Sequence, residues 1–395
     1  MHILLVTNDL AYFRAHRERL ALDLLAMGHE VSVACGGCAG VRLDGWDARL
    51  TLHELELDKH HLRPLGDLGL AWTLRRLYRK IKPDVVHCIT IKPILFGGIG
   101  LFIAHWRAKH GPAMVWTFAG LGKVFERSYS PAKRLRRYLV QSVLIVICRR
   151  HRVFCTFENE SDKDYLIEKA VASPSREEAL MGTGMDLERF SPGEDRTRLP
   201  DEAPLVFFMG TRLIGEKGVD TYLKAAKNIQ DQGGNARFLL AGLLDETNPD
   251  AIPLSTLERA HADEVIEFLG GLSQDDMVEA FRNADVSVAP TRLREGFPRA
   301  LLEAAACGNA IVASDQIPMR VLVPRARPSR ATGLLIFPPD SANLTAAFET
   351  LLKNPQHTRQ MGRRARELVE NIPVAAQDIA EAFASIYQRV LNVQR

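Results

Sequence analysis

The sequence predicts an α/β protein built from two doubly wound, Rossmann-like domains, and three observations predict this class. Short apolar segments alternate with helical segments along most of the chain, which implies parallel sheets covered by helices on both faces. A stretch rich in glycine, proline and charge interrupts this alternation once. The chain has 395 residues, which is long for one ordinary domain. In such a fold the carboxyl ends of the two sheets face a shared cleft, where ligands bind.

The first series of elements is predicted from buried apolar runs and from helix stop signals. The run at residues 3–6 indicates a short buried strand, and residues 13–27 have helical spacing that ends at Gly28. The strand at 84–87 directly follows Pro83. The remaining elements of this series are strands at 30–34, 113–117 and 153–156, and helices at 65–81 and from about residue 93.

The second series of elements begins after the interruption. Its strands are predicted at 205–209, 238–241, 265–269, 286–289 and 310–313, and residues 274–283 are predicted to form a helix. From about residue 342 the chain continues as charged amphipathic helices. We therefore expect a first domain at 1–185, a linker at 186–203, a second domain at 204–372, and a terminal helix at 373–395 that crosses back to the first domain.

The composition indicates a soluble globular protein, because 46% of the residues are hydrophobic and 25% are charged. The amino terminus lacks the basic region of a signal peptide, and the longest apolar runs, at 93–106 and 139–148, are too short to span a bilayer. Six cysteines in a chain of this length predict the reducing cytoplasm rather than a disulfide framework. Cys35 and Cys38 have the spacing of a metal or redox pair, but no second pair completes a zinc site, which favours a strand end and a glycine turn.

Basic residues are concentrated between residues 101 and 152, where eleven basic side chains accompany one acidic side chain. A basic cluster beside an apolar helical stretch is attracted to an anionic membrane surface, by about 1 kcal/mol per nearby cation. A solvated basic face and a nucleic-acid patch are the alternatives, and the sequence contains no recognised RNA- or DNA-binding module, which argues against nucleic acid. We therefore expect peripheral contact with the inner face of the cell membrane through Lys133, Arg134, Arg136 and Arg137.

The segment at 294–315 contains the strongest candidate site. Glu295 and Glu303 are eight positions apart, just over two helical turns, so both carboxylates are expected near one line. Pro298 suits the first helical turn, and the free N–H groups of residues 299–301 are expected to form an anion site. Carboxylates that bind hydroxyls beside an anion site suit a nucleotide-sugar. The alternative is an ordinary capped amphipathic helix.

A second motif lies at residues 210–218, between the first strand and the first helix of the second domain. Gly210 and the other glycines permit a tight turn, and Arg212 and Lys217 are placed to contact phosphate oxygens from two directions. The spacing matches neither a Walker loop nor a dinucleotide fingerprint, and a plain turn is the alternative. Gly242, after the strand at 238–241, marks a third glycine turn at the same sheet edge.

With these motifs the second domain resembles the family 4 retaining glycosyltransferases, which have the GT-B fold. Their paired-glutamate element matches Glu295 and Glu303, and the resemblance implies that Glu303 binds the ribose while Glu295 contacts the transferred sugar. It also implies that Arg212 and Lys217 bind the diphosphate. The resemblance also implies that backbone N–H groups in the segment of Gly296, Phe297, Pro298, Arg299 and Ala300 hold the sugar and the distal phosphate, although Pro298 itself has no N–H. The family's linker pattern is matched by Gly182, Gly184, Asp186, Arg189, Phe190 and Pro192.

The first domain is similar to one bacterial branch of that family, whose members extend undecaprenyl-diphosphate-linked sugars in surface-polysaccharide or glycan assembly. The matching segments lie at residues 13–17, 89–93 and 119–122. They make Arg17 and Lys92 candidate phosphate ligands. The substrate site on this side is also expected to include Gly120 and Gly122. Many members carry a glycine pair after the first strand and a histidine after the strand at 113–117, where this chain has Asn8, Asp9, Thr117 and Phe118.

The resemblance implies sugar transfer with retained anomeric configuration and without a metal ion or other cofactor. The acceptor hydroxyl would attack the face that the nucleotide leaves, and the departing phosphate oxygen would take its proton. Asp275 and Asp276 are better explained as a helix start than as a metal site. We expect a nucleotide-sugar donor, UDP-linked in preference, and a polyprenyl-diphosphate-linked acceptor. A nucleotide-sugar 2-epimerase and a catalytically silent nucleotide- or membrane-binding subunit remain as alternatives.

Overall fold

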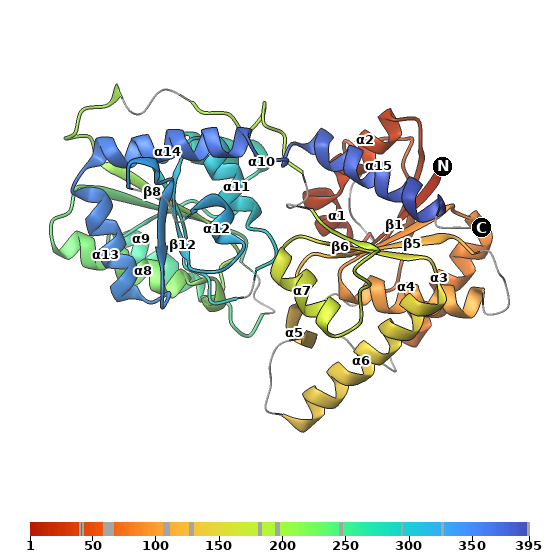
Figure 1. Cartoon of the computed structure of the whole chain (residues 1–395). Helices are drawn as coiled ribbons and strands as arrows, with labels where there is room; N and C mark the ends of the chain where they lie inside the picture. Colours follow the sequence, from red (N-terminus) through yellow and green to blue (C-terminus); the bar gives the residue numbers. More distant parts are fainter. Residues whose placement is uncertain are drawn as a thin grey trace. The chain divides into compact units, whose positions relative to one another are not determined.

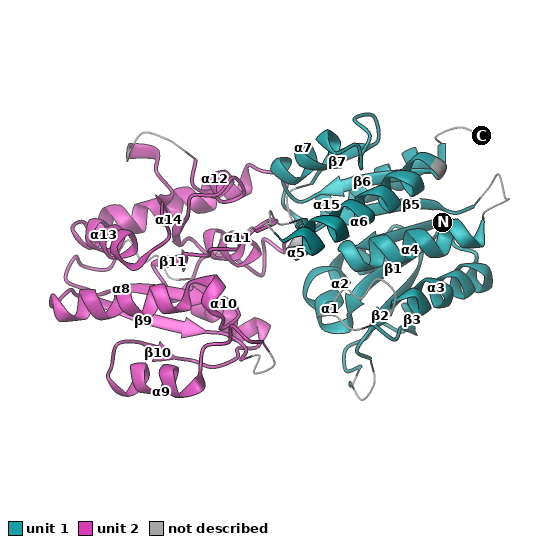
Figure 2. Cartoon of the chain, turned by 90° about the horizontal axis from the view of Figure 1, so that it is seen from below, with its two compact units in different colours: residues 1–184, 374–395 teal, residues 185–373 magenta. Residues whose placement is uncertain are grey.

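The computed structural model describes residues 1–38, 41, 43–57, 67–105, 111–125, 130–180, 184–193, 198–244, 248–293, 295–324 and 328–392. Some residues of the predicted helices, linker and linker pattern lie outside this described part: 65–66, Gly182, 194–197 and 393–395. The chain forms two compact units, coloured separately in Figure 2: residues 1–184 with 374–395, and residues 185–373. Each unit contains one parallel sheet with helices packed on it (Figure 1). The predicted α/β class with two doubly wound sheets is confirmed.

The sheet of unit 1 has seven parallel strands in the order β3-β2-β1-β4-β5-β6-β7. One apolar core fills the face covered by α3, α4 and α6, and a second fills the face covered by α1, α2 and α15. The strands are β1 (His2–Asp9), β2 (Glu30–Gly36), β3 (Thr51–Glu54), β4 (Val85–Ile89), β5 (Ala113–Phe118), β6 (Val153–Phe157) and β7 (Glu177–Ala179). The helices are α1 (Leu10–His16), α2 (Glu18–Ala26), α3 (Leu68–Ile81), α4 (Ile91–Ala104), α5 (Gly122–Phe125), α6 (Pro131–Arg150), α7 (Glu160–Glu168) and α15 (Ala376–Asn392).

The sheet of unit 2 has six parallel strands in the order β10-β9-β8-β11-β12-β13. The strands are β8 (Leu205–Gly210), β9 (Ala236–Ala241), β10 (Glu267–Phe268), β11 (Val286–Ala289), β12 (Ala310–Ser314) and β13 (Gly333–Ile336). The helices are α8 (Val219–Asp231), α9 (Leu254–Ala262), α10 (Gln274–Arg282), α11 (Arg299–Ala306), α12 (Met319–Leu322), α13 (Ser341–Leu352) and α14 (Pro355–Glu370), with short 3-10 turns at Gly215–Lys217 and Pro328–Arg330. An apolar core between the sheet, α8 and α13 contains an aromatic cluster of Phe207, Tyr222, Phe238 and Phe348.

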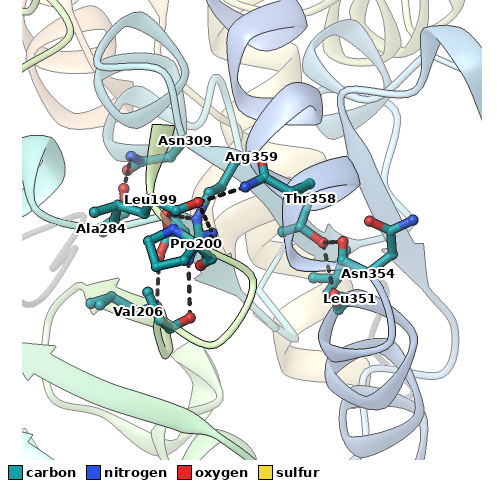
Figure 3. Close-up of polar contacts among 12 residues, drawn as sticks. Leu199, Pro200, Val206, Ala284, Asn309, Leu351, Asn354, Thr358 and Arg359 are labelled. Carbon is teal, nitrogen blue, oxygen red and sulfur yellow. Dashed lines mark hydrogen bonds and ion pairs between the residues drawn. The ribbon is translucent and has the colours of Figure 1, made fainter. Parts of the chain in front are cut away.

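The segment at 186–203, expected to be a linker, is fastened to unit 2 by arginines. Arg282 donates to the carbonyls of Arg189 and Ser191, and Arg366 donates to the Phe190 carbonyl at 2.7 Å. Figure 3 shows Arg359 of α14 beside Leu199 and Pro200, whose carbonyls accept from its Nη1 at 3.4 and 3.2 Å. The described part of this segment therefore belongs to unit 2, as the division of the chain also has it.

The structure differs from the prediction in the bounds of one helix, in additional strands and in the position of Pro298. The helix expected at 13–27 is two helices, α1 and α2, because the backbone at Arg17 leaves the helical region with φ −134°. Strands β3, β7 and β13 were not predicted, since the first two are short and polar edge strands without an apolar run. Pro298 is the residue that precedes α11, not its first helical residue, with φ −80° and ψ 79°.

Candidate functional site

The second unit brings the predicted motifs together at the carboxyl-terminal edge of its sheet. The loops after β8, β9, β11 and β12 meet there, which is the position where doubly wound sheets bind ligands. Gly242, after β9, lies so close to the loop after β8 that a Cβ atom would stand 1.8 Å from the Thr211 carbonyl oxygen. Only glycine allows this approach, so the glycine turns that the sequence indicated hold two neighbouring loops together.

The loop after β8 is fixed at both ends. The backbone N–H groups of Gly215 and Glu216 donate to the carbonyl and the carboxylate of Asp250, at 2.9 and 2.6 Å. Gly218 has φ +83°, and a Cβ atom there would lie 2.3 Å from the carbonyl oxygen of Pro290. The short turn that carries Lys217 is therefore held between these two contacts. Asp250 was not predicted from the sequence, because no motif around it indicates a contact with a loop so distant along the chain.

Lys217 and Glu295 form an ion pair at this edge. The Lys217 Nζ lies 2.6 Å from Glu295 Oε1, and the Thr291 hydroxyl donates to the same oxygen at 3.0 Å. Both charged side chains are about one-fifth exposed. The predicted cation and the first predicted carboxylate therefore lie in direct contact, although 78 positions separate them in the sequence.

Gln316, after β12, fixes the backbone that carries Glu295. Its carbonyl oxygen accepts from the Glu295 N–H at 3.3 Å, and its amide donates to the Leu293 carbonyl at 2.8 Å. On the other side, the Arg292 N–H donates to the Glu216 carbonyl at 2.8 Å and its guanidinium pairs with Asp220 at 3.1 Å. These residues link the loops after β8, β11 and β12. Sequence reasoning missed Gln316 and Arg292 because each acts through contacts between distant segments.

Glu295 and Glu303 do not lie on one helix, so the expected alignment by helical spacing is wrong. Helix α11 begins at Arg299, and Glu295 lies in the loop before it. Glu303 is 8% exposed, and Arg299 Nε donates to its carboxylate at 2.7 Å. Burial raises the pKa of the Glu303 carboxyl, and the nearby Arg299 opposes this shift. The second carboxylate is therefore nearly enclosed, with one arginine beside it.

The anion site expected from free N–H groups is only partly present. The Arg299 N–H donates to the Phe297 carbonyl at 2.9 Å, and the Leu301 N–H donates to the Pro298 carbonyl at 3.0 Å. Two of the three N–H groups expected to be free are thus engaged in the first turn. The Ala300 N–H lies between them, on a residue that is exposed. Gly296 and Phe297 complete the loop, and the Phe297 side chain is buried.

Arg212 is exposed, five positions before Lys217 on the same loop. A hollow of about 550 Å³ adjoins the loop after β11, and its walls include Thr291, Arg292 and Gln316. This volume is within the range of roughly 300–1,000 Å³ that small-molecule sites occupy. Among the described residues, Lys217 and Glu295 do not line this hollow, whereas Thr291 and Gln316, which hydrogen-bond to Glu295, do.

In unit 1, Arg17 is fully buried and is not placed as a surface ligand for phosphate. Its Nη2 lies 2.7 Å from Glu158 Oε1, immediately after β6. Burial opposes the charge of the guanidinium, but Tyr12 and Glu158 outweigh it and raise the pKa of Arg17. The Nε and Nη1 atoms have no hydrogen-bond partner among the described residues. Arg17, which was expected to bind phosphate, is thus the buried counter-ion of Glu158. Glu158 was not predicted from the sequence.

Lys92, the other candidate, is 7% exposed at the start of α4 and pairs with Asp67 at 3.0 Å. Thr90, just before this helix, has φ +72°, which a β-branched residue adopts only under strain. Its hydroxyl is buried and has no partner within the described part of the chain. Gly120 has φ +94°, and Gly122 begins α5. Thr90 thus combines backbone strain with an unsatisfied hydroxyl at the carboxyl-terminal edge of the unit 1 sheet.

Thr117, which stands where many members of the family have histidine, belongs to a buried hydrogen-bond network. His87 Nε2 lies 2.6 Å from the Thr117 hydroxyl, and its Nδ1 lies 2.7 Å from the hydroxyl of Tyr387 in α15. Thr117 also contacts the Thr156 hydroxyl at 2.6 Å. Burial, with Arg17 nearby, holds the pKa of His87 well below its ordinary value, so the imidazole is neutral.

The basic cluster predicted to contact a membrane lies in the first two turns of α6. Lys133 and Arg134 are exposed, while Arg136 and Arg137 are partly buried. A hollow of about 460 Å³ is lined by Arg134 and Arg137 together with Tyr138. Leu135, Tyr138, Leu139 and Val146 expose 59, 66, 55 and 53% of their surface along the same helix. Across the described residues, no helix is both long and apolar enough to cross a membrane.

The Cys35 and Cys38 thiols lie 3.6 Å apart at the end of β2, and both are free. Burial raises the pKa of both thiols, which keeps them protonated. In the part of the chain that the structure describes, no three histidine, cysteine or acidic side chains are grouped to hold a metal ion. The acidic pair Asp275 and Asp276 lies in the first turn of α10, and the Ser273 hydroxyl accepts from the Asp276 N–H, as a helix start requires.

Comparison with known proteins identifies the class. Residues 193–368 match the family model for glycosyl transferases group 1, and residues 14–161 match that of a glycosyl transferase 4-like domain. Over 356 residues the chain is 25% identical to the N,N'-diacetylbacillosaminyl-diphospho-undecaprenol alpha-1,3-N-acetylgalactosaminyltransferase of Campylobacter jejuni, with 88% of each chain covered.

Solved structures support the same fold. Sucrose-phosphate synthase from Thermosynechococcus elongatus superposes with a TM-score of 0.77 at 19% identity over the whole of both chains. HepE from Anabaena, solved in complex with UDP, superposes with a TM-score of 0.73 at 17% identity, over 98% of this chain and 100% of that one. The protein is thus a glycosyltransferase with the GT-B fold. Within that class, it belongs to family 4.

Proposed function

We propose that the protein transfers a sugar, with retained anomeric configuration, from a nucleotide-sugar to a saccharide linked to a lipid diphosphate. The observation that carries the donor half is the Lys217–Glu295 pair at the carboxyl-terminal edge of the unit 2 sheet. A diphosphate requires cations, and a transferred sugar requires a hydrogen-bond acceptor, and this pair supplies one of each. A UDP-linked donor is favoured, since HepE, which has the same fold, was solved with UDP bound.

The roles of the charged residues follow from their positions. Arg212 and Lys217 would bind the diphosphate and stabilise the charge that develops on it as the sugar–phosphate bond breaks. Glu295, released from Lys217 by the phosphate, would then position the sugar and stabilise positive charge at its anomeric carbon. Glu303 would accept hydrogen bonds from the ribose hydroxyls. The acceptor oxygen would form the new glycosidic bond on the face that the nucleotide leaves, and its proton would pass to the departing phosphate oxygen.

Metal independence is part of the proposal, because two protein cations are available where other enzymes use a divalent ion. The test is to assay transfer after treatment with a chelator, and again with added Mg²⁺ or Mn²⁺. Full activity with the chelator is expected. Activity that disappears with the chelator and returns with one metal would contradict this part of the proposal.

The acceptor half of the proposal rests on the relative from Campylobacter jejuni, whose name specifies an undecaprenol-diphosphate-linked acceptor. The basic cluster on α6, with Lys133 and Arg134 exposed beside exposed apolar residues, suits the anionic surface in which such a lipid lies. We therefore propose that the protein acts in the cytoplasm, as a peripheral protein on the inner face of the cell membrane.

The first test measures thermal stability with UDP, GDP and ADP, for the wild type and for Arg212→Ala. A nucleotide at one hundred times its dissociation constant adds about 2.7 kcal/mol to the free energy of unfolding. We expect UDP alone to raise the melting temperature, and the shift to be smaller for Arg212→Ala. A shift with GDP or ADP instead would indicate a donor linked to that nucleotide. The absence of a shift with any of the three nucleotides would contradict a preformed nucleotide site.

A further inference from the structure

Helices α4 and α6 of unit 1 enclose an apolar groove that the proposed transfer reaction does not use. The groove has a volume of about 290 Å³, and its walls come from Ile99 and Phe102 of α4 and from Val143, Val146 and Ile147 of α6. Ser142 is the one polar residue among the described residues that line it. The two helices pack against each other, and Figures 1 and 2 show them side by side. Val146 leaves 53% of its surface exposed at the groove, so an apolar ligand can reach it from outside.

The same helix carries a cationic hollow closer to its amino terminus. Arg134 and Arg137 line that hollow together with Tyr138. Tyr138 and Val146 are eight positions apart on α6, which corresponds to about 12 Å along the axis at the usual rise of a helix. One helix therefore presents a site for negative charge at one point and a site for hydrocarbon at another.

We infer that the α4–α6 groove binds the isoprenoid chain of the lipid-diphosphate acceptor. This inference rests on the proposed function, because it assumes an acceptor of that class. The diphosphate suits the cationic hollow at Arg134 and Arg137, and the chain runs from there along α6 to the groove. This separation exceeds the reach of the two isoprene units of a geranyl chain, so undecaprenyl diphosphate occupies both sites while geranyl diphosphate occupies only the cationic hollow.

The geometry favours a chain over the flat surface of a bilayer. A hollow bounded by two helices encloses a single hydrocarbon chain on several sides, whereas a bilayer contacts only the most exposed residues of a helix. Leu139 is an exposed residue of the sort that a bilayer would contact, because it exposes 55% of its surface on α6 and does not line the groove. Substitutions at Val146 and at Leu139 therefore distinguish binding of the chain from contact with a membrane.

The experiment compares the affinity of the full-length protein for undecaprenyl diphosphate and for geranyl diphosphate, both in the same non-ionic detergent, where no bilayer is present. The variant is Val146→Asp, and the matched control is Leu139→Asp. We expect wild type to prefer the long chain, and Val146→Asp to reduce that preference about tenfold or more without changing geranyl diphosphate binding, as loss of one buried apolar contact predicts. Leu139→Asp is expected to keep the preference.

Ser142→Trp, which fills the groove without adding charge, should reduce the preference in the same way, and unchanged melting temperatures would show that the variants are folded. Equal preferences in wild type and both groove variants would overturn the inference. An equal loss of the long-chain preference in Leu139→Asp would also overturn the inference, because it would assign the effect to the exposed face of α6. Failure of the proposed function is distinguishable, because sugar transfer would then be absent in the wild type whether or not the groove binds the chain.

Discussion

At the scale of single residues, the site depends on charges that are neutralised by one another before a substrate arrives. Lys217 and Glu295 share an ion pair, and Glu303 has Arg299 beside it. A diphosphate would compete with Glu295 for Lys217, which couples donor binding to the release of the carboxylate that is to contact the sugar. In the proposed function, binding of the donor would therefore exchange the partners of these charges.

Glu295→Ala and Arg212→Ala are each expected to lower turnover by about two decades or more, since each removes a group that acts on charge in the transition state. The measurement is the steady-state rate of transfer from the nucleotide-sugar. Arg237→Ala serves as the control, because Arg237 lies at the opposite, amino-terminal end of strand β9. A near-normal rate in either site variant would contradict the assignment.

The pKa of Glu303 predicts how nucleotide affinity depends on pH. Burial raises this pKa above the ordinary value of 4.5, so the carboxyl takes up a proton at a higher pH than an exposed glutamate does. Because the ionised form is the better acceptor for ribose hydroxyls, affinity is expected to fall as the pH decreases through that raised pKa. Calorimetric titration with UDP at a series of pH values measures it, and Glu303→Gln should remove the dependence. The same slope in both proteins would assign it to another group.

At the scale of elements, the loop that carries Lys217 depends on one close backbone contact. Gly218→Ala would place a Cβ atom 2.3 Å from the Pro290 carbonyl, at a residue with φ +83°. We expect this variant to lose more than about 1 kcal/mol of stability and most of its activity, because the loop must move.

Gly233→Ala is the matched control, since Gly233 has φ +71° but no atom within 4 Å of the added carbon. The loss of stability in Gly233→Ala is expected to reflect the backbone angle alone, and this variant should retain its activity. Urea unfolding measures both variants. Equal losses of stability and activity in the two would show that the contact with Pro290 does not matter.

The elements also show which features can be predicted from sequence. Glu295, Glu303, Arg212 and Lys217 were identified by their residue types and spacing, and the structure brings Lys217 and Glu295 together. Helical spacing did not predict that Glu295 precedes α11, because a proline within such a pattern marks a helix start without fixing which residue is the first. The supporting contacts of Asp250 and Gln316 join distant segments, and periodicity carries no information about them.

At the scale of the whole molecule, buried charge ties the strands of unit 2 to its last helices. Arg359 of α14 and Asp285, before β11, are both buried, and Arg359 Nε lies 3.3 Å from Asp285 Oδ1. The Asp285 carboxylate also accepts from the Val206 N–H of β8 at 2.9 Å. The two buried sheets were predictable because each central strand is an apolar run. A buried arginine, however, looks in sequence like any charge on an amphipathic helix, and this applies to Arg17 as well.

Arg359→Leu is expected to lower the free energy of unfolding by about 3–5 kcal/mol, because it leaves the Asp285 carboxylate buried without its partner. Arg363→Leu on the same helix is exposed and should change stability by no more than about 0.5 kcal/mol. Chemical denaturation of the two variants gives the comparison. A loss below 1 kcal/mol for Arg359→Leu would mean that neither the ion pair nor the carbonyl contacts of Arg359 stabilise unit 2.

The return of α15 to unit 1 has a consequence for the order of synthesis. Phe383 and Tyr387 fill one face of the first sheet, and Tyr387 hydrogen-bonds to His87. During translation, residues 1–184 leave the ribosome before these side chains have been made. Unit 2 is the continuous segment 185–373, so all of its residues have emerged before α15 is made. Domains generally fold as they emerge, the amino-terminal one first. Here the later-made unit can finish first, and the earlier-made unit keeps one apolar face only partly covered, by α1 and α2, until α15 has been synthesised.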